Sequence, residues 1–540
     1  MKQKNTFLKN ASFLMIAALV SRVIGLVYRI PLNAIVGRTG MGYYSFAFSV
    51  YSILLLISSY SIPMAVSKVV SERLALGQYR SAHKVFKGAM IYACIVGGIA
   101  ALVALFGAPY LIPQNQPNAI PALQVLTPTI FLSAILGVLR GYFQAHNTMI
   151  PTSASQIIEQ ILNAIVSVLA AWLLIKYLAA DAVEEATWGA AGGTVGTGAG
   201  VLAGLLFMTF VYYINRGTLR RQLKRDRTGV DISYREVFRI ILLMVTPVIF
   251  STFIYNVSSY IDGYMFSSIM GRHRIDDELI SATYAEFSSY YMTLINIPLS
   301  LSSASSTAVV PNISGHYARG EISKANQKID EAVQLTMFIS VPAAVGLAVL
   351  GHPIIQLFFP TTTGIAGNLL MIGAVSIVFS SLSTITNGVL QGIGKPQIPV
   401  RNAAIALVLN VVFLFCGLWF TDKLGIIAVL VATILYSVSM CILNGIYLKK
   451  YLGYKNEFRD SYGKPFLASA GMGLVAWGSY YGLHHLLPHN IVCLAVAVPL
   501  AVFTYIILFV AIVKAPEDQL RRLPAGNIIY KLAKKLRLYK

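Results

Sequence analysis

Long apolar segments recur from one end of the 540-residue chain to the other, separated by short stretches of Pro, Gly and charged residues. Each segment has at least about 18 residues, which is enough for a helix to cross the hydrocarbon core of a bilayer. The pattern predicts an all-α integral membrane protein with about fourteen transmembrane helices. The predicted spans are residues 7–35, 43–69, 85–108, 121–143, 150–177, 188–214, 237–267, 284–310, 329–350, 367–390, 399–420, 426–448, 465–486 and 491–513.

The loops between these spans differ in charge. One set of alternate loops holds most of the Lys and Arg residues, whereas the other set carries mainly acidic residues or no charge, with Arg38, Arg272 and Arg274 as exceptions. Because basic loops are retained in the cytoplasm, this asymmetry predicts that both termini are cytoplasmic and that the number of spans is even. The acidic residues of the outer loops include Asp181, Glu184, Glu185, Asp276, Asp277 and Glu278.

Three short patterns occur twice, in the same order and about 240 residues apart. With six spans in each copy the repeats are parallel, and such halves commonly rock against each other around a central site. We therefore predict an N-lobe at residues 1–236 with a basic linker, a C-lobe at 237–464, and two extra helices with a basic tail at 465–540. A duplicated scaffold without a transport cycle is the alternative. The first pair is Gly137-Val-Leu-Arg-Gly141 and Gly388-Val-Leu-Gln-Gly392. In the second pair, Ser71, Gly77, Gln78 and Ala82 match Ser314, Gly320, Glu321 and Ala325. The third pair is Ile35-Val-Gly-Arg38 and Ile269-Met-Gly-Arg272.

The composition agrees with membrane insertion. Hydrophobic residues make up 56% and charged residues 12% of the chain, and an ordinary globular domain has about twice that share of charge. The net charge of +21 does not indicate nucleic-acid binding, because the basic residues lie in short tracts between apolar runs. Such tracts attract anionic membrane lipids. We expect no metal site, since Cys94, Cys416, Cys441 and Cys493 lie in apolar runs without metal-ligand or redox spacing. We also expect the protein to be a monomer.

Two arginines lie inside the first apolar segment, which we interpret as a retained helix and not as a signal peptide. Arg22 and Arg29 are seven residues, or about two helical turns, apart and project from nearly one face, with Gly25 between them. An arginine at the bilayer centre costs roughly 3 kcal/mol unless it meets water, an anion or a partner. A guanidinium pair that lines a water-filled cavity suits a diphosphate, because its planar fork donates to phosphate oxygens in a bidentate way. For Arg29, snorkelling to the outer headgroups is the alternative.

Asp262 in the seventh predicted span falls at nearly the position equivalent to Arg22. It pairs with an arginine across the cleft, binds a coupling cation, or is a solvated residue near the outer mouth; the sequence leaves these alternatives open. Arg140 lies at the cytoplasmic end of the fourth span, where it either meets an incoming headgroup or anchors the helix at the interface.

The fifth span carries a polar face formed by Gln156, Glu159, Gln160 and Asn163, which are three or four residues apart. Glu159 is a candidate proton or cation site, and a structural hydrogen-bond role for the amides is the alternative. The sequence shows no phosphate-binding loop, His-Glu-x-x-His pattern or nucleophile elbow, so we expect a transporter and not an enzyme. No cofactor is expected; the open alternatives for the driving force are a coupling monovalent cation, a proton, the membrane potential or substrate supply.

Three parts of the sequence resemble a known family: Leu8 to Gly25, Gly77-Gln-Tyr-Arg-Ser-Ala-His-Lys84, and Gly388-Val-Leu-Gln-Gly-Ile-Gly-Lys-Pro396. They are similar to the polysaccharide-transporter branch of the MOP exporter superfamily, and within it to the MurJ-like lipid II flippases of Gram-positive type, close to stage V sporulation protein B. The resemblance covers essentially the whole chain and implies a V-shaped, MATE-like fold in the bacterial cytoplasmic membrane.

The resemblance also implies a cationic central cavity, carried here by Arg22 and Arg29, and a lipid-tail groove formed by the last two helices. Where family members of Gram-negative type have an Asp-Arg pair early in the eighth helix, this chain has Ser289-Tyr-Tyr-Met-Thr-Leu294. The leading hypothesis is a lipid II flippase for peptidoglycan synthesis, and hence for the cell wall and cell shape. Alternatives are a flippase for a capsule or teichoic-acid precursor, a multidrug or cation antiporter, a glycan polymerase or ligase, and the scaffold.

Overall fold

The structure is a computed structural model, and it describes residues 20–60, 62–146, 148–226, 228, 232–420, 425–454, 459–513, 526 and 534. The predicted start of the first span, residues 7–19, lies outside the described residues, as does the basic tail beyond residue 513 apart from 526 and 534. All described elements are helices. The chain divides into two compact units, Met1–Ala285 and Glu286–Lys540, here called unit 1 and unit 2.

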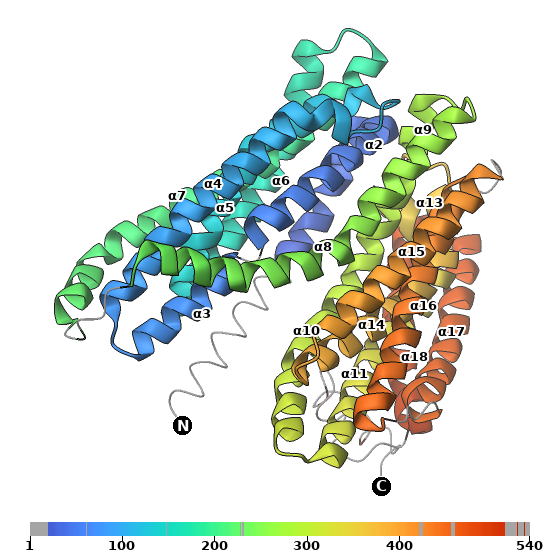
Figure 1. Ribbon diagram of the computed structural model, residues 1–540. Coiled ribbons are helices and arrows are strands. Elements are labelled where there is room, and N and C mark those ends of the chain that lie inside the picture. The colour runs from blue at the N-terminus through green and yellow to red at the C-terminus, as the bar shows by residue number, and fades with distance from the viewer. Residues whose placement is uncertain are drawn as a thin grey trace. The chain divides into compact units, whose positions relative to one another are not determined.

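Unit 1 is a bundle of helices (Figure 1). The helices pack through apolar side chains. Buried side chains such as Val70, Val85 and Met208 form its core. Helical residues 20–27 precede α2 (Arg29–Leu55), a π-helix (Leu56–Tyr60), α3 (Ile62–Ala75), α4 (Tyr79–Leu111), a 3₁₀ turn (Pro117–Ala119), α5 (Ile120–Ala145), α6 (Ile150–Leu178), α7 (Ala182–Arg225), α8 (Tyr234–Arg272) and α9 (Asp277–Ala285).

Unit 2 has two apolar clusters. Ile329, Ile385 and Leu448 belong to one cluster, and the other joins α17 and α18 to Phe338, whose carbonyl accepts a hydrogen bond from Tyr505 Oη at 3.0 Å. The elements are a π-helix (Glu286–Tyr291), α10 (Met292–Ala318), α11 (Ile322–Val349), α12 (Gly351–Phe358), α13 (Ile365–Gly373), α14 (Val375–Gly392), α15 (Gln397–Trp419), α16 (Gly425–Leu452), a π-helix (Arg459–Gly463), α17 (Lys464–Leu486) and α18 (Asn490–Val513).

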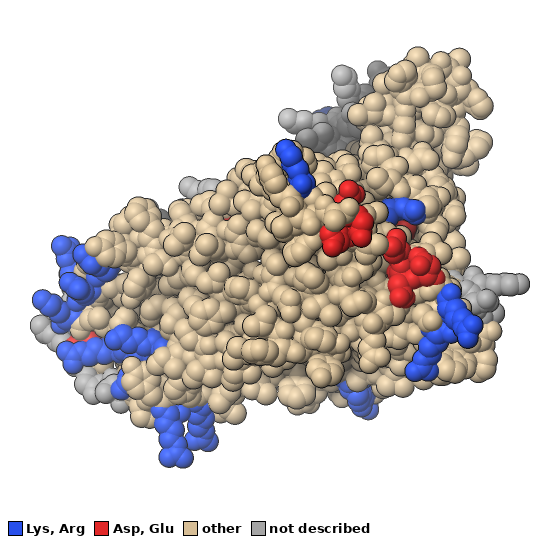
Figure 2. All heavy atoms as spheres, turned by 90° about the horizontal axis from the view of Figure 1, so that it is seen from above, with Lys and Arg blue, Asp and Glu red and all other residues tan. Residues whose placement is uncertain are grey.

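The chain is a multi-pass membrane protein. Large apolar side chains such as Phe106, Tyr110 and Leu474 are exposed, as lipid contact requires, and most of the face seen in Figure 2 carries no charge. In the described part nine helices are long and apolar enough to cross a membrane, or ten if the pair α13–α14, bent by 49°, is one span. This number is lower than the predicted fourteen partly because the helical stretch Arg29–Ala75 is counted as one span. The backbone of Gly37, with φ 71° and ψ 176°, nevertheless interrupts α2 within this stretch.

The turns after the second and eighth predicted spans share one local structure. Gly77 and Gly320 both have φ +74°, a conformation that glycine adopts without a steric penalty. The following residues close the turns in the same way, since Gln78 N donates to Arg73 O at 2.9 Å and Glu321 N donates to His316 O at 3.0 Å. These are two of the residue pairs that the sequence repeat matches.

The boundary between the compact units differs from the predicted boundary between the lobes. The units part after Ala285, whereas the repeat places the boundary after residue 236. Helices α8 and α9 belong to unit 1 because α8 packs on α4 and α9 packs on α2. The units are defined by contacts within the structure, whereas the lobes are defined by repeated sequence. The lobes 1–236 and 237–464 therefore stay a prediction.

Candidate functional site

Arg22 and Arg29 lie on a nearly continuous helical stretch of unit 1. Tyr28, between the helical residues 20–27 and α2, has φ −70° and ψ −21°, so the two arginines are about two turns apart, as predicted. Arg22 is exposed and Arg29 is half-buried beside the side chains of Tyr28 and Tyr44. A Cβ atom added to Gly25 would meet only Gln160 Oε1, at 3.9 Å, among the described residues. The helix therefore presents an open face towards the polar side of α6.

The polar residues of α6 differ in their surroundings. Asn163 is buried, and its Oδ1 accepts a hydrogen bond from Ser167 Oγ at 2.9 Å. The same hydroxyl lies 2.8 Å from the carbonyl of Gly193 on α7, so Asn163 takes part in helix packing. Gln156 Oε1 is buried and has no hydrogen-bond donor within the described part of the chain. It is thus a buried acceptor whose hydrogen-bonding capacity is not used by the described residues.

Arg140 and Glu159 form an ion pair, although the sequence assigns them separate roles. Arg140 Nη2 on α5 lies 2.7 Å from Glu159 Oε2 on α6, and the side chains are only 16% and 21% exposed. Arg140 Nε also donates to Ser155 Oγ at 2.9 Å. The opposite charge offsets part of the cost of removing each group from water. The structure thus brings together a candidate headgroup ligand and a candidate coupling carboxylate.

Asp262 on α8 is only 4% exposed, so it is not the solvated residue of the third alternative. Ser258 Oγ lies 3.4 Å from Asp262 Oδ2, and the phenol of Tyr284 is near enough to interact with the carboxylate electrostatically. Tyr284 also stacks on Phe46 of α2, with 4.4 Å between ring centroids. Pairing with an arginine and binding of a cation stay hypotheses for this residue.

Glu286 is a buried carboxylate that no sequence pattern indicated. It is 0% exposed and accepts hydrogen bonds from Thr362 Oγ1 at 2.5 Å, Thr363 N at 2.9 Å and Ala366 N at 3.0 Å. The carboxylate thereby caps the N-terminus of α13, where the helix dipole favours a negative charge. Three threonines before Gly364 signal a helix start, but sequence spacing does not reveal a partner so far away along the chain.

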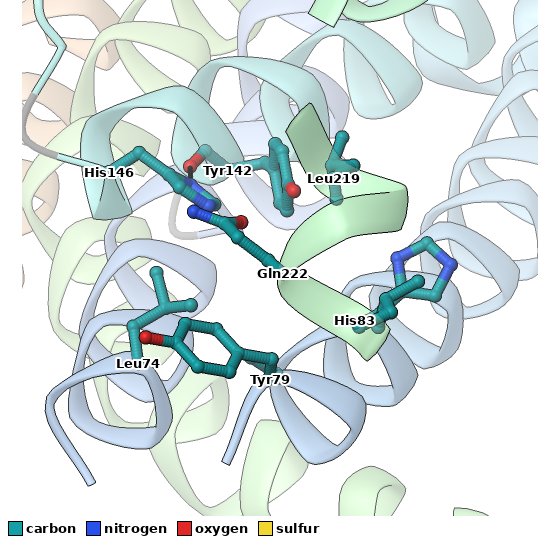
Figure 3. Close-up of a pocket in the computed structure, with 9 residues that line it drawn as sticks. Leu74, Tyr79, His83, Tyr142, His146, Leu219 and Gln222 are labelled. Carbon is teal, nitrogen blue, oxygen red and sulfur yellow. Dashed lines mark hydrogen bonds between the residues drawn. The ribbon is translucent and has the colours of Figure 1, made fainter. Parts of the chain in front are cut away.

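Two cavities are of interest, and they differ in size and polarity. An apolar groove of about 440 Å³ in unit 2 is lined by α11, α13, α14 and α17, with Ala344, Val378 and Phe466 among its walls. A cavity of about 10 Å³ in unit 1 lies among Tyr79, His146 and Gln222 (Figure 3), which is room for about one water molecule. Within the described residues no group of three or more His, Cys, Asp or Glu side chains is arranged to hold a metal ion.

Charged groups inside apolar helices are typical of a membrane transporter. The sequence profile described as "Polysaccharide biosynthesis protein" matches residues 7–316. The chain belongs to this family, that of the lipid-linked oligosaccharide flippases of the MOP superfamily, which are transporters and not enzymes. A second profile, "MatE", matches residues 247–416.

Two relatives from Bacillus subtilis (strain 168) support this assignment. The chain is 26% identical to "Lipid II flippase MurJ" over 83% of each chain. It is 24% identical to "Stage V sporulation protein B" over 97% of this chain and 99% of the relative. Among solved structures, "Lipid II flippase MurJ, inward closed conformation" matches 92% of this chain and 97% of its own with a TM-score of 0.65 and 16% identity. That likeness shows a MurJ-like fold.

Proposed function

We propose that the protein moves a lipid-linked glycan, lipid II as the leading candidate, from the inner to the outer leaflet of the bacterial cytoplasmic membrane by alternating access. The observation that carries the proposal is the placement of arginines in the spans of unit 1: Arg22 on an open helix face, Arg29 beside two tyrosines, and Arg140 between α5 and α6. Guanidinium groups suit a diphosphate headgroup, whereas a cation antiporter favours carboxylates. Delivery of lipid II to the outer leaflet would serve peptidoglycan synthesis.

A different lipid-linked polymer unit, such as a capsule or teichoic-acid precursor, is the second candidate. Residues 289–294 lack the Asp-Arg pair expected from the MurJ proteins of Gram-negative type. One relative, matched over 99% of its own length, is named for sporulation and not for lipid II. Both observations are compatible with a cargo that shares the diphosphate and differs in the sugar.

The proposed architecture has fourteen spans in two parallel lobes and two further helices, with both termini in the cytoplasm. The matching turns at Gly77 and Gly320 support the repeat. The apolar groove beside α17 has the polarity and the size to receive part of an isoprenoid tail. Because the sequence has no ATP site, we propose that a proton, a monovalent cation or the membrane potential drives the cycle, with Asp262 and Glu159 as the carboxylates available to it.

Depletion of the protein in its native host tests the cargo. We expect lipid II to accumulate in the inner leaflet, and the outer-leaflet pool to be restored by the wild-type gene but not by an Arg29→Gln variant. Normal delivery of lipid II during depletion, in a host without another flippase, contradicts lipid II as cargo. Loss of a capsule or teichoic-acid precursor from the outer leaflet in the same cells would favour the second candidate.

A further inference from the structure

The ion pair between Arg140 and Glu159 joins two spans of unit 1. The pairs at Glu321 and between Lys328 and Glu331 differ from it, since they join side chains at most five positions apart near helix ends. A pair inside the membrane has to neutralise two charges that the bilayer disfavours. It is a candidate for a role beyond local helix stability.

The described residues leave some hydrogen-bond donors of Arg140 and one acceptor oxygen of Glu159 unused. A guanidinium has five N–H donors, and a carboxylate has two acceptor oxygens. Within the described residues Arg140 uses one donor on Glu159 and one on Ser155, and Glu159 accepts through Oε2 alone. Glu286 differs, because both of its oxygens accept hydrogen bonds from the chain. Glu286 therefore has the contacts of a structural cap, whereas Arg140 and Glu159 keep donors and an acceptor for another partner.

Three described residues near the pair carry no charge. On α7, a Cβ atom added to Gly204 would lie 3.7 Å from Arg140 Nη2, so glycine leaves space beside the guanidinium. On α2, Tyr51 is near enough to interact with Glu159 electrostatically. Gln156, one turn before Glu159, has a buried oxygen without a donor. Glu159 is thus the resident anion that balances Arg140, and a second anion has to compete with it.

We propose that Glu159 is an exchangeable counter-ion, which the diphosphate of the cargo displaces from Arg140. The inference rests on the proposed function, because it needs a diphosphate headgroup. A diphosphate carries more charge than one carboxylate and accepts from the guanidinium fork in a bidentate way. The unused donors of Arg140 allow the phosphate to bind before Glu159 leaves, so the guanidinium is never buried without an anion. Glu159 then makes headgroup binding reversible, because it forms the ion pair with Arg140 again when the cargo leaves.

Binding of farnesyl diphosphate to the full-length purified protein tests the exchange. Glu159→Gln keeps the side-chain shape and removes the competing charge, so its affinity for farnesyl diphosphate should rise about tenfold, equivalent to roughly 1.4 kcal/mol. Arg140→Gln should lower the affinity, and the double variant should bind no more tightly than Arg140→Gln alone. Farnesol, which has no phosphate, should bind all variants equally.

Glu331→Gln is the matched control, because it removes a carboxylate from the pair with Lys328 and should leave the affinity unchanged. Glu159→Asp retains the charge at shorter reach, and it should bind with an affinity between those of the wild type and Glu159→Gln. Equal or weaker binding of farnesyl diphosphate by Glu159→Gln, in a protein that still binds it through the wild-type site, contradicts the exchange alone. A wild-type protein that binds farnesyl diphosphate no better than farnesol contradicts both the exchange and the proposed function.

Discussion

Three carboxylates of this protein differ in how many hydrogen bonds their oxygens accept. Glu286 accepts bonds through both oxygens and caps α13. Glu321 lies in the turn before α11, where His316 Nδ1 and Lys324 Nζ are 2.6 and 3.2 Å from its oxygens. Within the described part of the chain, Glu159 has one side-chain bond, to Arg140. At the scale of single residues, the number of partners distinguishes groups that hold the fold from a group that has capacity for a ligand.

Glu321 should make stability depend on pH. The hydrogen bond with His316, together with Lys324, lowers the pKa of Glu321 to about 2 from its usual value of 4.5. Because the folded-state pKa is depressed, the carboxylate contributes stability above pH 4.5, and this contribution is lost as the pH falls through about 2. Glu321→Gln should therefore lower the melting temperature at pH 7, and the difference from the wild type should shrink between pH 4.5 and pH 2. A difference in melting temperature that does not change with pH would show that the ionised carboxylate of Glu321 does not stabilise the fold.

Arg29 should be needed for transport in a way that lysine cannot replace. Arg29→Gln should reduce the rate of glycan-lipid flipping by at least about tenfold, and Arg29→Lys should restore only part of it, because an ammonium group lacks the planar fork. Arg216→Gln is a control, since Arg216 is exposed and lies over the ring of Tyr213. Wild-type flipping by a folded Arg29→Gln protein would exclude this residue from headgroup binding.

At the scale of helices, glycines of the repeated pattern allow close packing in each unit. A Cβ atom on Gly141 of α5 would lie 2.6 Å from the carbonyl oxygen of Pro63 on α3. A Cβ atom on Gly392 of α14 would lie 2.5 Å from Ser314 Oγ on α10. The first contact joins the fourth predicted span to the second, and the other joins α14 to α10, the helices that contain most of the tenth and eighth predicted spans. The recurrence of these glycines in the sequence therefore has the same packing reason in both copies.

Gly141→Ala should destabilise the protein by about 1–3 kcal/mol, because the added methyl group forces α5 away from rigid backbone. Gly445→Ala on α16 is the matched control, since nothing lies within 4 Å of a Cβ atom there. Alanine favours a helix more than glycine does, so this control should be neutral or stabilising by up to about 1 kcal/mol. Thermal unfolding in detergent measures both effects, and equal shifts would contradict close packing at Gly141.

The sequence predicts the helices well because lipid-facing segments carry a strong apolar signal. It also predicts the turns at Gly77 and Gly320, whose residues repeat. The contact of Arg140 with Glu159 joins two helices, and that of Glu286 with Thr362 joins a π-helix to the loop before α13. No periodicity within one segment reveals either contact. For the same reason the burial of Asp262, which depends on α9 and α2, could not be predicted from its own span.

For the whole molecule, membership of the flippase family and the arginines in the spans of unit 1 support the proposal that the protein moves a diphosphate-linked glycan lipid across the bilayer. Proteoliposomes that contain the purified chain and lipid II with a fluorescent headgroup test it most directly. The measurement is the rate at which inner-leaflet lipid becomes accessible to a quencher that does not cross the membrane. We predict a rate clearly above that of liposomes without protein or with Arg29→Gln. A rate equal to that of protein-free liposomes, for lipid II and for other diphosphate-linked glycans alike, would contradict the account.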